Sequence, residues 1–154
     1  MNVIFFVCEV TEMLISTKGR YALRVMVELA YHKNNEYVPL KTIANEQSIS
    51  EKYLESIIVT LSKAGIIDGL RGKGGGYRLN REPKDYTVGE ILRLTEGSIA
   101  PVACLDCVPN KCERAASCKT LPMWEKLNTI ISNYLDSVTI ADLIDSSGIG
   151  DYQI

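Results

Sequence analysis

The segment from Gly65 to Gly76 holds six glycines among twelve residues, and no other segment constrains the fold as strongly. Glycine disfavours a continued helix and instead permits a tight, adaptable connection. The apolar pair at residues 66–67 suits a strand before this connection, and residues 77–79 suit a returning strand after it. The pattern therefore predicts a β-hairpin with a glycine-rich tip.

Two predicted helices lie directly before this hairpin. The first begins at Leu40 in the sequence LKTIANEQ, and a turn at residues 48–49 follows it. Ser50 is suited to cap the second helix, which covers residues 51–64 and ends at Gly65. A longer amphipathic helix precedes the pair. We therefore expect a mainly α fold with a small β-hairpin, in the order of a winged helix-turn-helix domain.

The pattern of helices, loops and glycines divides the chain into six segments. The start of the first helical pattern makes Met13 the expected native start, and the residues before it an upstream extension. The segments that we expect are the extension at 1–12, the winged helix-turn-helix at 13–82, a connecting helix at 83–97, a cysteine-rich loop at 98–120, a long dimerisation helix at 121–145 and a loose tail at 146–154.

Composition and charge limit the functions that the chain can have. Its 154 residues are 46% hydrophobic and 23% charged, which suits one globular domain or a small domain with an appendage. No apolar run approaches the roughly 20 residues that a membrane span needs, and the start lacks a secretion signal, so we expect a cytoplasmic protein. Residues 14–93 carry a net charge of +4 and the remainder −6. This asymmetry fits either a polyanion-binding face or a mixed solvated surface.

The second helix of the pair and the hairpin tip carry side chains suited to DNA. Such a helix can enter the major groove, where hydroxyl and lysine side chains reach phosphates and base edges. Arginine and lysine between glycines can approach a backbone closely, and arginine favours narrow minor grooves. The DNA-contacting residues that we predict are Ser50, Lys52, Tyr53, Glu55 and Ser56 on the helix and Arg71, Gly72 and Lys73 at the tip.

Two of these features have alternative interpretations. Glu55 on a DNA-facing helix repels phosphate, but it can accept a hydrogen bond from cytosine N4 and so discriminate between bases. It can equally be a solvated glutamate that pairs with a neighbouring lysine. The glycines could instead hold the phosphate of a nucleotide, but the sequence GKGGG has neither the spacing nor the context of a known nucleotide-binding loop.

Four of the five cysteines form the pattern Cys104-x2-Cys107-x4-Cys112-x5-Cys118. In a chain without a secretion signal, such a cluster indicates metal or redox chemistry before structural disulfides. Thiolates are the ligands of zinc and of iron-sulfur clusters, and a [2Fe–2S] cluster needs four ligands. A reduced or redox-active set without metal is the alternative. No catalytic motif stands out elsewhere, so we do not expect an enzyme.

Long stretches of the sequence resemble the IscR/NsrR/CymR-like winged-helix regulators of bacteria. The stretches are STKGRYALRVMVELA, ISEKYLESIIVTLSKAGII, LRGKGGGYRL and TVGEILRLTEG, and the resemblance runs from about residue 13 to residue 143. It implies a homodimeric transcription factor that binds a pseudo-palindromic site in double-stranded DNA. The two chains would pair through residues 122–137.

The resemblance also implies roles for single residues of the DNA-binding part. Glu55 occupies a recognition-helix position used for base discrimination, and Lys52 and Ser56 flank it. Arg71 and Gly72 occupy the tip of the wing.

In the cysteine loop, Cys104, Cys112 and Cys118 match the three cysteines of the cluster-containing branch, although the first interval is longer. The usual fourth ligands are missing, because Leu121 replaces a histidine and Arg20 replaces an acidic residue. Cys107 is then the expected fourth ligand.

The expected function is therefore a DNA-binding regulator controlled by an iron-sulfur cluster, most simply [2Fe–2S]. The alternatives are a regulator of the same fold that binds no cluster and responds to thiols or cysteine metabolism, or one that binds zinc.

Overall fold

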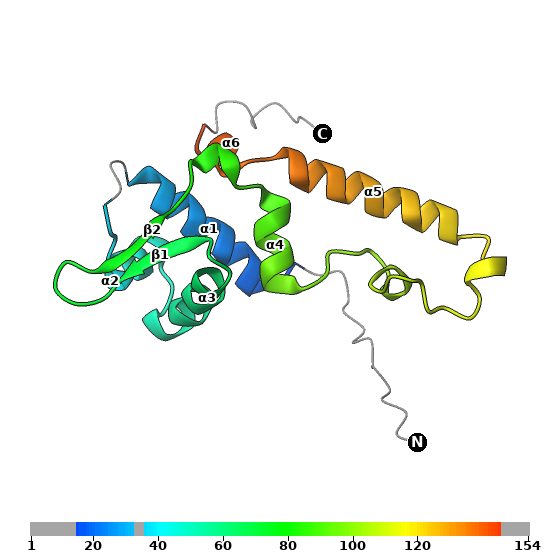
Figure 1. The fold of residues 1–154 in the computed structure, drawn as a ribbon, viewed down its shortest axis with the longest axis horizontal. Helices are drawn as coiled ribbons and strands as arrows, with labels where there is room; N and C mark the ends of the chain where they lie inside the picture. Colours follow the sequence, from blue (N-terminus) through cyan, green and yellow to red (C-terminus); the bar gives the residue numbers. More distant parts are fainter. Residues whose placement is uncertain (1–14, 33–35, 146–154) are drawn as a thin grey trace, which may run out of the picture.

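The computed structural model describes residues 15–32 and 36–145 (Figure 1). The expected extension at 1–12, the start at Met13 and the tail at 146–154 lie outside these residues. The helices and strands are α1 (Thr17–Tyr31), α2 (Leu40–Gln47), α3 (Glu51–Lys63), β1 (Ile67–Leu70), β2 (Gly76–Leu79), α4 (Val88–Glu96), α5 (Leu121–Ser137) and α6 (Ile140–Ile144), with short 3-10 turns at Pro83–Asp85, Ala103–Leu105 and Ala115–Ser117. The predicted mainly α fold with a β-hairpin is confirmed.

The boundaries of the helix pair follow from local chemistry. The Ser50 hydroxyl accepts a hydrogen bond from the Tyr53 backbone N–H and so caps α3. Ser48 takes a left-handed conformation with φ of 52° at the end of α2, which turns the chain between the two helices. Gly65, with φ of 69°, ends α3 and directs the chain into the hairpin.

The hairpin pairs β1 with β2 in an antiparallel register that places Asp68 opposite Arg78. Val38, just before α2, forms an isolated bridge with Tyr77 through two backbone hydrogen bonds of 2.8 and 2.9 Å. Gly76 permits this approach, since a Cβ there would lie 2.3 Å from the Val38 carbonyl oxygen. The wing is therefore attached by its backbone to the start of the helix-turn-helix.

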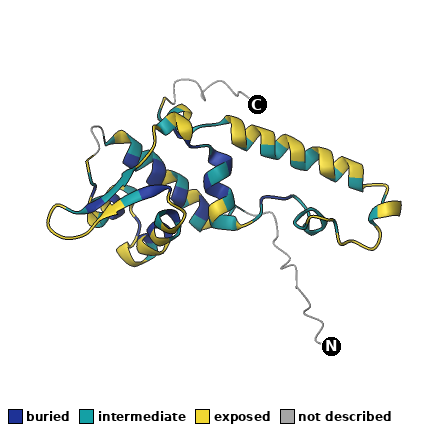
Figure 2. Cartoon of the chain, viewed as in Figure 1, coloured by how far each residue is buried: buried dark blue, intermediate teal, exposed yellow. Residues whose placement is uncertain are grey.

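One main hydrophobic core fills the space between α1, α2, α3, the base of the hairpin and α6 (Figure 2). Its fully buried side chains include Met26, Leu54, Ile57 and Ile91. Each such side chain contributes roughly 1.5–3 kcal/mol through removal of apolar surface from water.

Tyr86 is also fully buried in this core, and its hydroxyl is a centre of hydrogen bonds. The hydroxyl oxygen accepts hydrogen bonds from the backbone N–H groups of Asn80 and Arg81, at 3.0 and 2.8 Å. The hydroxyl also donates a hydrogen bond of 3.0 Å to the carbonyl oxygen of Ile66. Both ends of the hairpin are thereby fixed to one buried side chain.

The segment at 121–145, in which we expect the dimerisation helix, forms two helices in the structure. Val138 and Thr139 separate α5 from α6, and the Thr139 side chain caps α6 in a capping box with Asp142. The following Ile140 is fully buried in the main core, and its N–H donates to the Tyr86 carbonyl. Within this segment, α5 projects from the body of the molecule and α6 packs on it (Figure 1).

Helix α5 extends away from the core and is exposed or half-exposed along its length (Figure 2). None of its residues is buried, and Met123, Ile130 and Tyr134 are at least half exposed. Its near end is joined to α4 by a two-pronged ion pair between Arg93 and Asp136, with N–O distances of 2.6 and 2.9 Å. Among the described residues, none of the helices is long and apolar enough to span a bilayer.

Candidate nucleic-acid interface and cysteine loop

The outer face of α3 carries the polar side chains that the sequence singled out. Leu54, Ile57, Ile58 and Leu61 occupy the inner face and are buried. Consequently Lys52, Glu55 and Ser56 are exposed together on the opposite side. The spacing of three and four residues places them within about one helical turn of each other. A polar surface on the second helix is the arrangement required for reading a major groove.

Two of the α3 residues predicted to contact DNA also form hydrogen bonds within the helix. Ser50 is committed to the Tyr53 N–H as a cap, and the Ser56 hydroxyl donates to the Tyr53 carbonyl at 2.7 Å. The half-buried Tyr53 ring meets the Tyr21 ring of α1 edge-on, with centroids 5.9 Å apart. Tyr53 therefore positions α3 against α1 as well as facing the surface.

Glu55 is solvated. Its carboxylate forms no ion pair within residues 15–32 and 36–145, so the expected alternative of pairing with a neighbouring lysine is not observed. The side chain is exposed and available to a partner that offers hydrogen-bond donors.

The wing tip presents its two cations to solvent. Arg71 and Lys73 are exposed, and Gly72 and Gly74 have φ values of 93° and 77° that allow the chain to turn between the strands. The Gly75 N–H donates to the Gly72 carbonyl at 3.0 Å and closes the turn.

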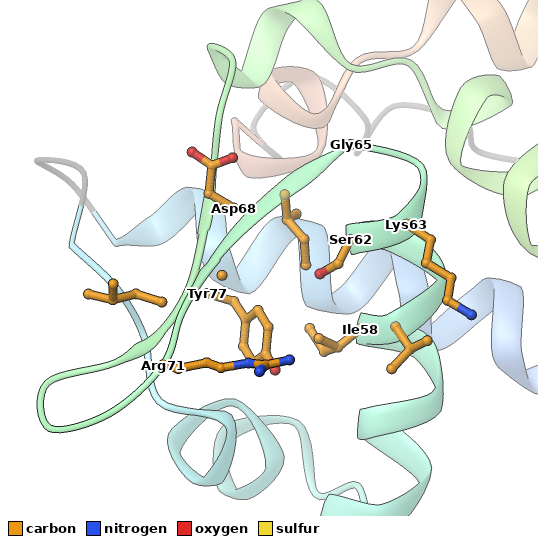
Figure 3. Close-up of a pocket in the computed structure, with 11 residues that line it drawn as sticks. Ile58, Ser62, Lys63, Gly65, Asp68, Arg71 and Tyr77 are labelled. Carbon is orange, nitrogen blue, oxygen red and sulfur yellow. The ribbon is translucent and has the colours of Figure 1, made fainter.

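Arg71 and the recognition helix belong to one surface. A single cleft is lined by the C-terminal half of α3, by β1 and by Arg71 (Figure 3). The two elements predicted to contact DNA are thus neighbours, although the cleft is lined by the C-terminal half of α3 and not by Lys52, Glu55 or Ser56.

The cysteine loop lies at the other end of the molecule and has little regular structure (Figure 1). The thiols of Cys104, Cys112 and Cys118 are free, whereas Cys107 is disulfide-bonded. No group of three or more His, Cys, Asp or Glu side chains within the described part of the chain is arranged to hold a metal ion. The residue types suit a metal, but in this conformation the donors do not converge.

The surroundings of Cys118 activate its thiol. The hydroxyl of Thr120 lies 3.4 Å from its sulfur, and this hydrogen bond is the largest cause of a lowered Cys118 pKa. Backbone groups at residues 120–121 and the charge of Arg114 act in the same direction. A lowered pKa enlarges the thiolate fraction, which is the form that reacts and binds metals.

The resemblance implies a fourth cluster ligand at one of two positions, and neither position carries a metal-binding side chain in this chain. Leu121 is the first residue of α5, and Arg20 is exposed on α1 with a hydrogen bond to the Thr17 hydroxyl.

Glu96 is a connecting residue that the sequence analysis missed. Its carboxylate accepts hydrogen bonds from the backbone N–H and the hydroxyl of Ser16, at 3.2 and 2.8 Å, at the N-terminus of α1. It is the last residue of α4, and the cysteine loop begins two residues later. Ile99, within that loop, is buried against Val88 and Leu92 of α4. The loop is thereby joined to the first helix of the winged helix-turn-helix.

Comparison with known proteins decides the family. Residues 15–146 match the Rrf2 family, which is described as iron-dependent transcriptional regulators. The chain belongs to the Rrf2 family. Among Rrf2 relatives, the regulator CymR of Bacillus subtilis (strain 168) is 41% identical over 132 residues, which cover 85% of this chain and 89% of CymR. The regulator IscR of Vibrio atlanticus (strain LGP32) is 36% identical over 132 residues, 86% of this chain and 75% of IscR.

Solved Rrf2 structures have the same fold. CymR (YrzC), described as the global cysteine regulator of B. subtilis, superposes with a TM-score of 0.71 at 38% identity, covering 86% of this chain and 97% of CymR. IscR of T. potens superposes with a TM-score of 0.69 at 38% identity, covering 92% and 93%. The resemblance to IscR- and CymR-like winged-helix regulators is confirmed, and the chain is a transcriptional regulator of this family.

Proposed function

We propose that this Rrf2 regulator reads DNA with α3 and the wing, and that the chemical state of its cysteine loop sets its affinity for DNA. The observation that carries this proposal is that α3 and Arg71 border one cleft. Lys52, Glu55 and Ser56 would face the major groove while Arg71 and Lys73 approach the adjacent minor groove. The protein acts as a binding module in the cytoplasm and not as an enzyme.

Two chains would bind one site as a homodimer. Met123, Ile130 and Tyr134 leave large apolar surfaces exposed on α5, and a second α5 is the simplest cover for them. A two-fold dimer calls for a pseudo-palindromic operator in double-stranded DNA. We expect Ile130→Asp to halve the mass in sedimentation while the helical circular dichroism is kept, with Lys126→Asp as the control. An unchanged mass would place the dimer contact elsewhere.

The signal that we propose first is an iron-sulfur cluster, [2Fe–2S], held by Cys104, Cys112 and Cys118 with Cys107 as the fourth ligand. Three free thiols and the similarity to IscR proteins support it. In the described conformation these donors do not fit a cluster, so the loop must rearrange and Cys107 must be reduced before one binds. We derive no step of the mechanism through the cluster.

A regulator without a cluster is the second candidate. The lowered pKa of Cys118 favours it, because a reactive thiol is sufficient to sense oxidants or thiol metabolites. The similarity to CymR, a global cysteine regulator in B. subtilis, points in the same direction. Zinc on the same thiols is the remaining alternative.

In either case the chain itself provides a route from the loop to the DNA-binding part. Movement of residues 98–100 would displace Ile99 and Glu96. The Glu96 carboxylate is hydrogen-bonded to Ser16 at the N-terminus of α1. Helix α1 packs against α3 in the main core. A change in the loop can therefore alter how α3 is presented to DNA, provided that the two loop states differ in this contact.

Anaerobic purification tests the signal. If a cluster binds, the protein is brown, contains iron and sulfide, and loses its visible absorbance in Cys112→Ala. A colourless protein that takes up no cluster on anaerobic reconstitution excludes the cluster but leaves the DNA proposal intact. Elemental analysis for zinc then separates the two remaining alternatives.

Selection of bound sequences from random duplexes tests DNA reading. We expect Glu55→Ala to bind a broader set of sequences than the wild type, since the glutamate no longer penalises other bases. Arg71→Ala should weaken binding to all duplexes and reduce its salt dependence. A wild type that retains no duplex would contradict the proposed function.

A further inference from the structure

One face of α1 contacts both sides of the turn that joins α2 to α3 (Figure 1). Tyr21, Arg24 and Glu28 are spaced by three and four residues, so they lie together on this face. Arg24 and Glu28 form hydrogen bonds with Gln47, the last residue of α2. Tyr21 contacts the ring of Tyr53 in the first turn of α3. We call these three α1 residues the α1 stripe.

Arg24 holds the end of α2 with two donors. Its Nε donates to the side-chain oxygen of Gln47 at 2.9 Å, and a terminal nitrogen donates to the Gln47 backbone carbonyl at 2.6 Å. A guanidinium suits this task, because its donors form a rigid fork. The carbonyl lies at the negative end of the α2 helix dipole, where a cation is favourable. Arg24 therefore fixes both the side chain and the backbone of the residue at which α2 ends.

The amide of Gln47 lies between a cation and an anion. Its oxygen accepts from Arg24, and its nitrogen donates to Oε2 of Glu28 at 2.7 Å. The other oxygen of that carboxylate, Oε1, lies 3.2 Å from Nε2 of His32. An amide provides one acceptor and two donors, so it satisfies both neighbours at once. A carboxylate at position 47 would be repelled by Glu28, and an ammonium group would be repelled by Arg24.

Tyr21 extends the stripe to the recognition helix. The Arg24 guanidinium lies over its ring, with 5.0 Å between the guanidinium carbon and the ring centroid. The same ring meets Tyr53 edge-on, with centroids 5.9 Å apart. Lys52 precedes Tyr53, and Glu55 follows it by two residues. The anchored turn of α3 therefore carries side chains that we propose to read the duplex.

The short connection makes the two anchors decisive for the direction of α3. Residues 48–50 alone separate α2 from α3, so a small shift of Gln47 relative to Tyr53 would tilt the recognition helix. We infer that Arg24 and Gln47 are positioning residues for sequence specificity, which hold α3 at the angle where Lys52 and Glu55 meet base edges. This inference rests on the proposed DNA binding, and it places two determinants of specificity outside the interface itself.

The ratio of the affinities for a selected duplex and a random duplex tests Arg24. Fluorescence anisotropy of the full chain between about 50 and 200 mM salt gives both affinities and their salt dependence. We expect Arg24→Met, which keeps an apolar stem beside Tyr21, to lower the ratio about tenfold, the effect of one misread base pair. The salt slope should stay constant, since the loss of a phosphate contact would reduce it by about 0.9. Arg20→Met removes the same charge from α1 and should keep the wild-type ratio.

Variants of Gln47 test the arrangement around its amide. Gln47→Ala should lower the ratio as Arg24→Met does, and the double variant should be no worse, because both changes remove the same bonds. Gln47→Glu should also lower the ratio, since the bond to Glu28 becomes a repulsion. Combining Gln47→Glu with Glu28→Gln keeps the net charge and restores an acceptor for Arg24 and a donor from position 28, so we expect the ratio to recover.

The results that overturn this role differ from those that overturn the proposed function. All ratios are measured at temperatures where unfolding curves show the variants to be folded. If folded Arg24→Met and Gln47→Ala keep the wild-type ratio, the stripe only stabilises the fold and the inference is wrong. If Arg24→Met weakens binding to both duplexes equally and lowers the slope, Arg24 contacts a phosphate itself, and the inference is wrong. If the wild type binds no duplex, the proposed function fails and the inference with it.

Discussion

The winged helix-turn-helix and the α5 region differ in how their apolar side chains are covered. In the former, α1, α3 and the hairpin share a continuous core whose central residues have no exposed surface. In α5, by contrast, no residue is buried, and the loop before it consists mainly of turns. The first region is complete within one chain, whereas the second presents surface that remains to be covered.

This difference assigns separate tasks to the two regions. A well-packed part keeps α3 and the wing in a fixed relation, as required for recognition of one duplex. A part with few internal contacts can change its arrangement at little energetic expense. We therefore expect the cysteine loop to sense the signal and the exposed surface of the packed region to recognise DNA, with α4 between the two.

The largest effect that tests this contrast is expected from a substitution that creates a cavity in the core. We expect Leu54→Ala to lower the free energy of unfolding by about 2–5 kcal/mol, because the residue is fully buried. Ile130→Ala on α5, measured at dilutions where the protein is monomeric, should change it by less than about 0.5 kcal/mol. Chemical denaturation measures both values. Equal losses would show that α5 is as well covered as α3.

Removal of one hydroxyl tests the attachment of the wing. We expect Tyr86→Phe to lower the free energy of unfolding by about 1–3 kcal/mol, since the buried backbone groups of Asn80, Arg81 and Ile66 lose their partner. Hydrogen exchange should accelerate at the Asn80 and Arg81 amides. Tyr134→Phe on α5, where the side chain is exposed, is the matched control. Unchanged exchange at the two amides would contradict the proposed anchor.

The hydrogen bonds of Glu96, which connect the two regions, are expected to contribute less to stability than the Tyr86 hydroxyl. We expect Glu96→Ala to lower the free energy of unfolding by about 1 kcal/mol, since a carboxylate that bonds to a helix N-terminus is removed. The variant should also respond less to the state of the cysteine loop, as measured by DNA affinity with the loop oxidised and reduced. Glu125→Ala, an exposed acid on α5, is the control. An undiminished response would mean that the signal bypasses Glu96.

The smallest expected effect concerns the ion pair between α4 and α5. Arg93 lowers the pKa of Asp136 through a hydrogen bond and through its charge. The pair therefore stabilises the fold above the unfolded value of about 3.9, and this contribution is lost as the pH falls through the lower pKa of the folded state. Because the pair is partly solvated, we expect Asp136→Asn to cost about 0.5 kcal/mol at pH 7.

Unfolding curves from pH 7 to pH 2 measure this effect. The difference between the wild type and Asp136→Asn should shrink below about pH 4. A difference that is constant over the whole range would exclude a titrating pair.

Local signals predicted most of the elements. Ser50 caps α3 as expected, and Gly65 ends that helix. Each of these residues acts within a few positions of its place in the chain, so its type alone is informative. The exposed face of α3 followed for the same reason, since helical spacing fixes which side is buried.

Contacts between distant residues were not predictable in this way. Glu96 and Ser16 are 80 positions apart, and nothing in either local sequence indicates that they meet. The burial of Ile140 also depends on distant packing, because this residue enters a core formed mainly by the first half of the chain.

The close approach at Gly76 has a consequence for variation at this hairpin. Any side chain there would collide with the Val38 carbonyl and break the bridge between Val38 and Tyr77. At Gly72 and Gly74 an added Cβ meets no atom within 4 Å, and asparagine tolerates their left-handed conformation. In saturation mutagenesis scored by promoter occupancy, position 76 should accept glycine alone, while asparagine survives at 72 and 74.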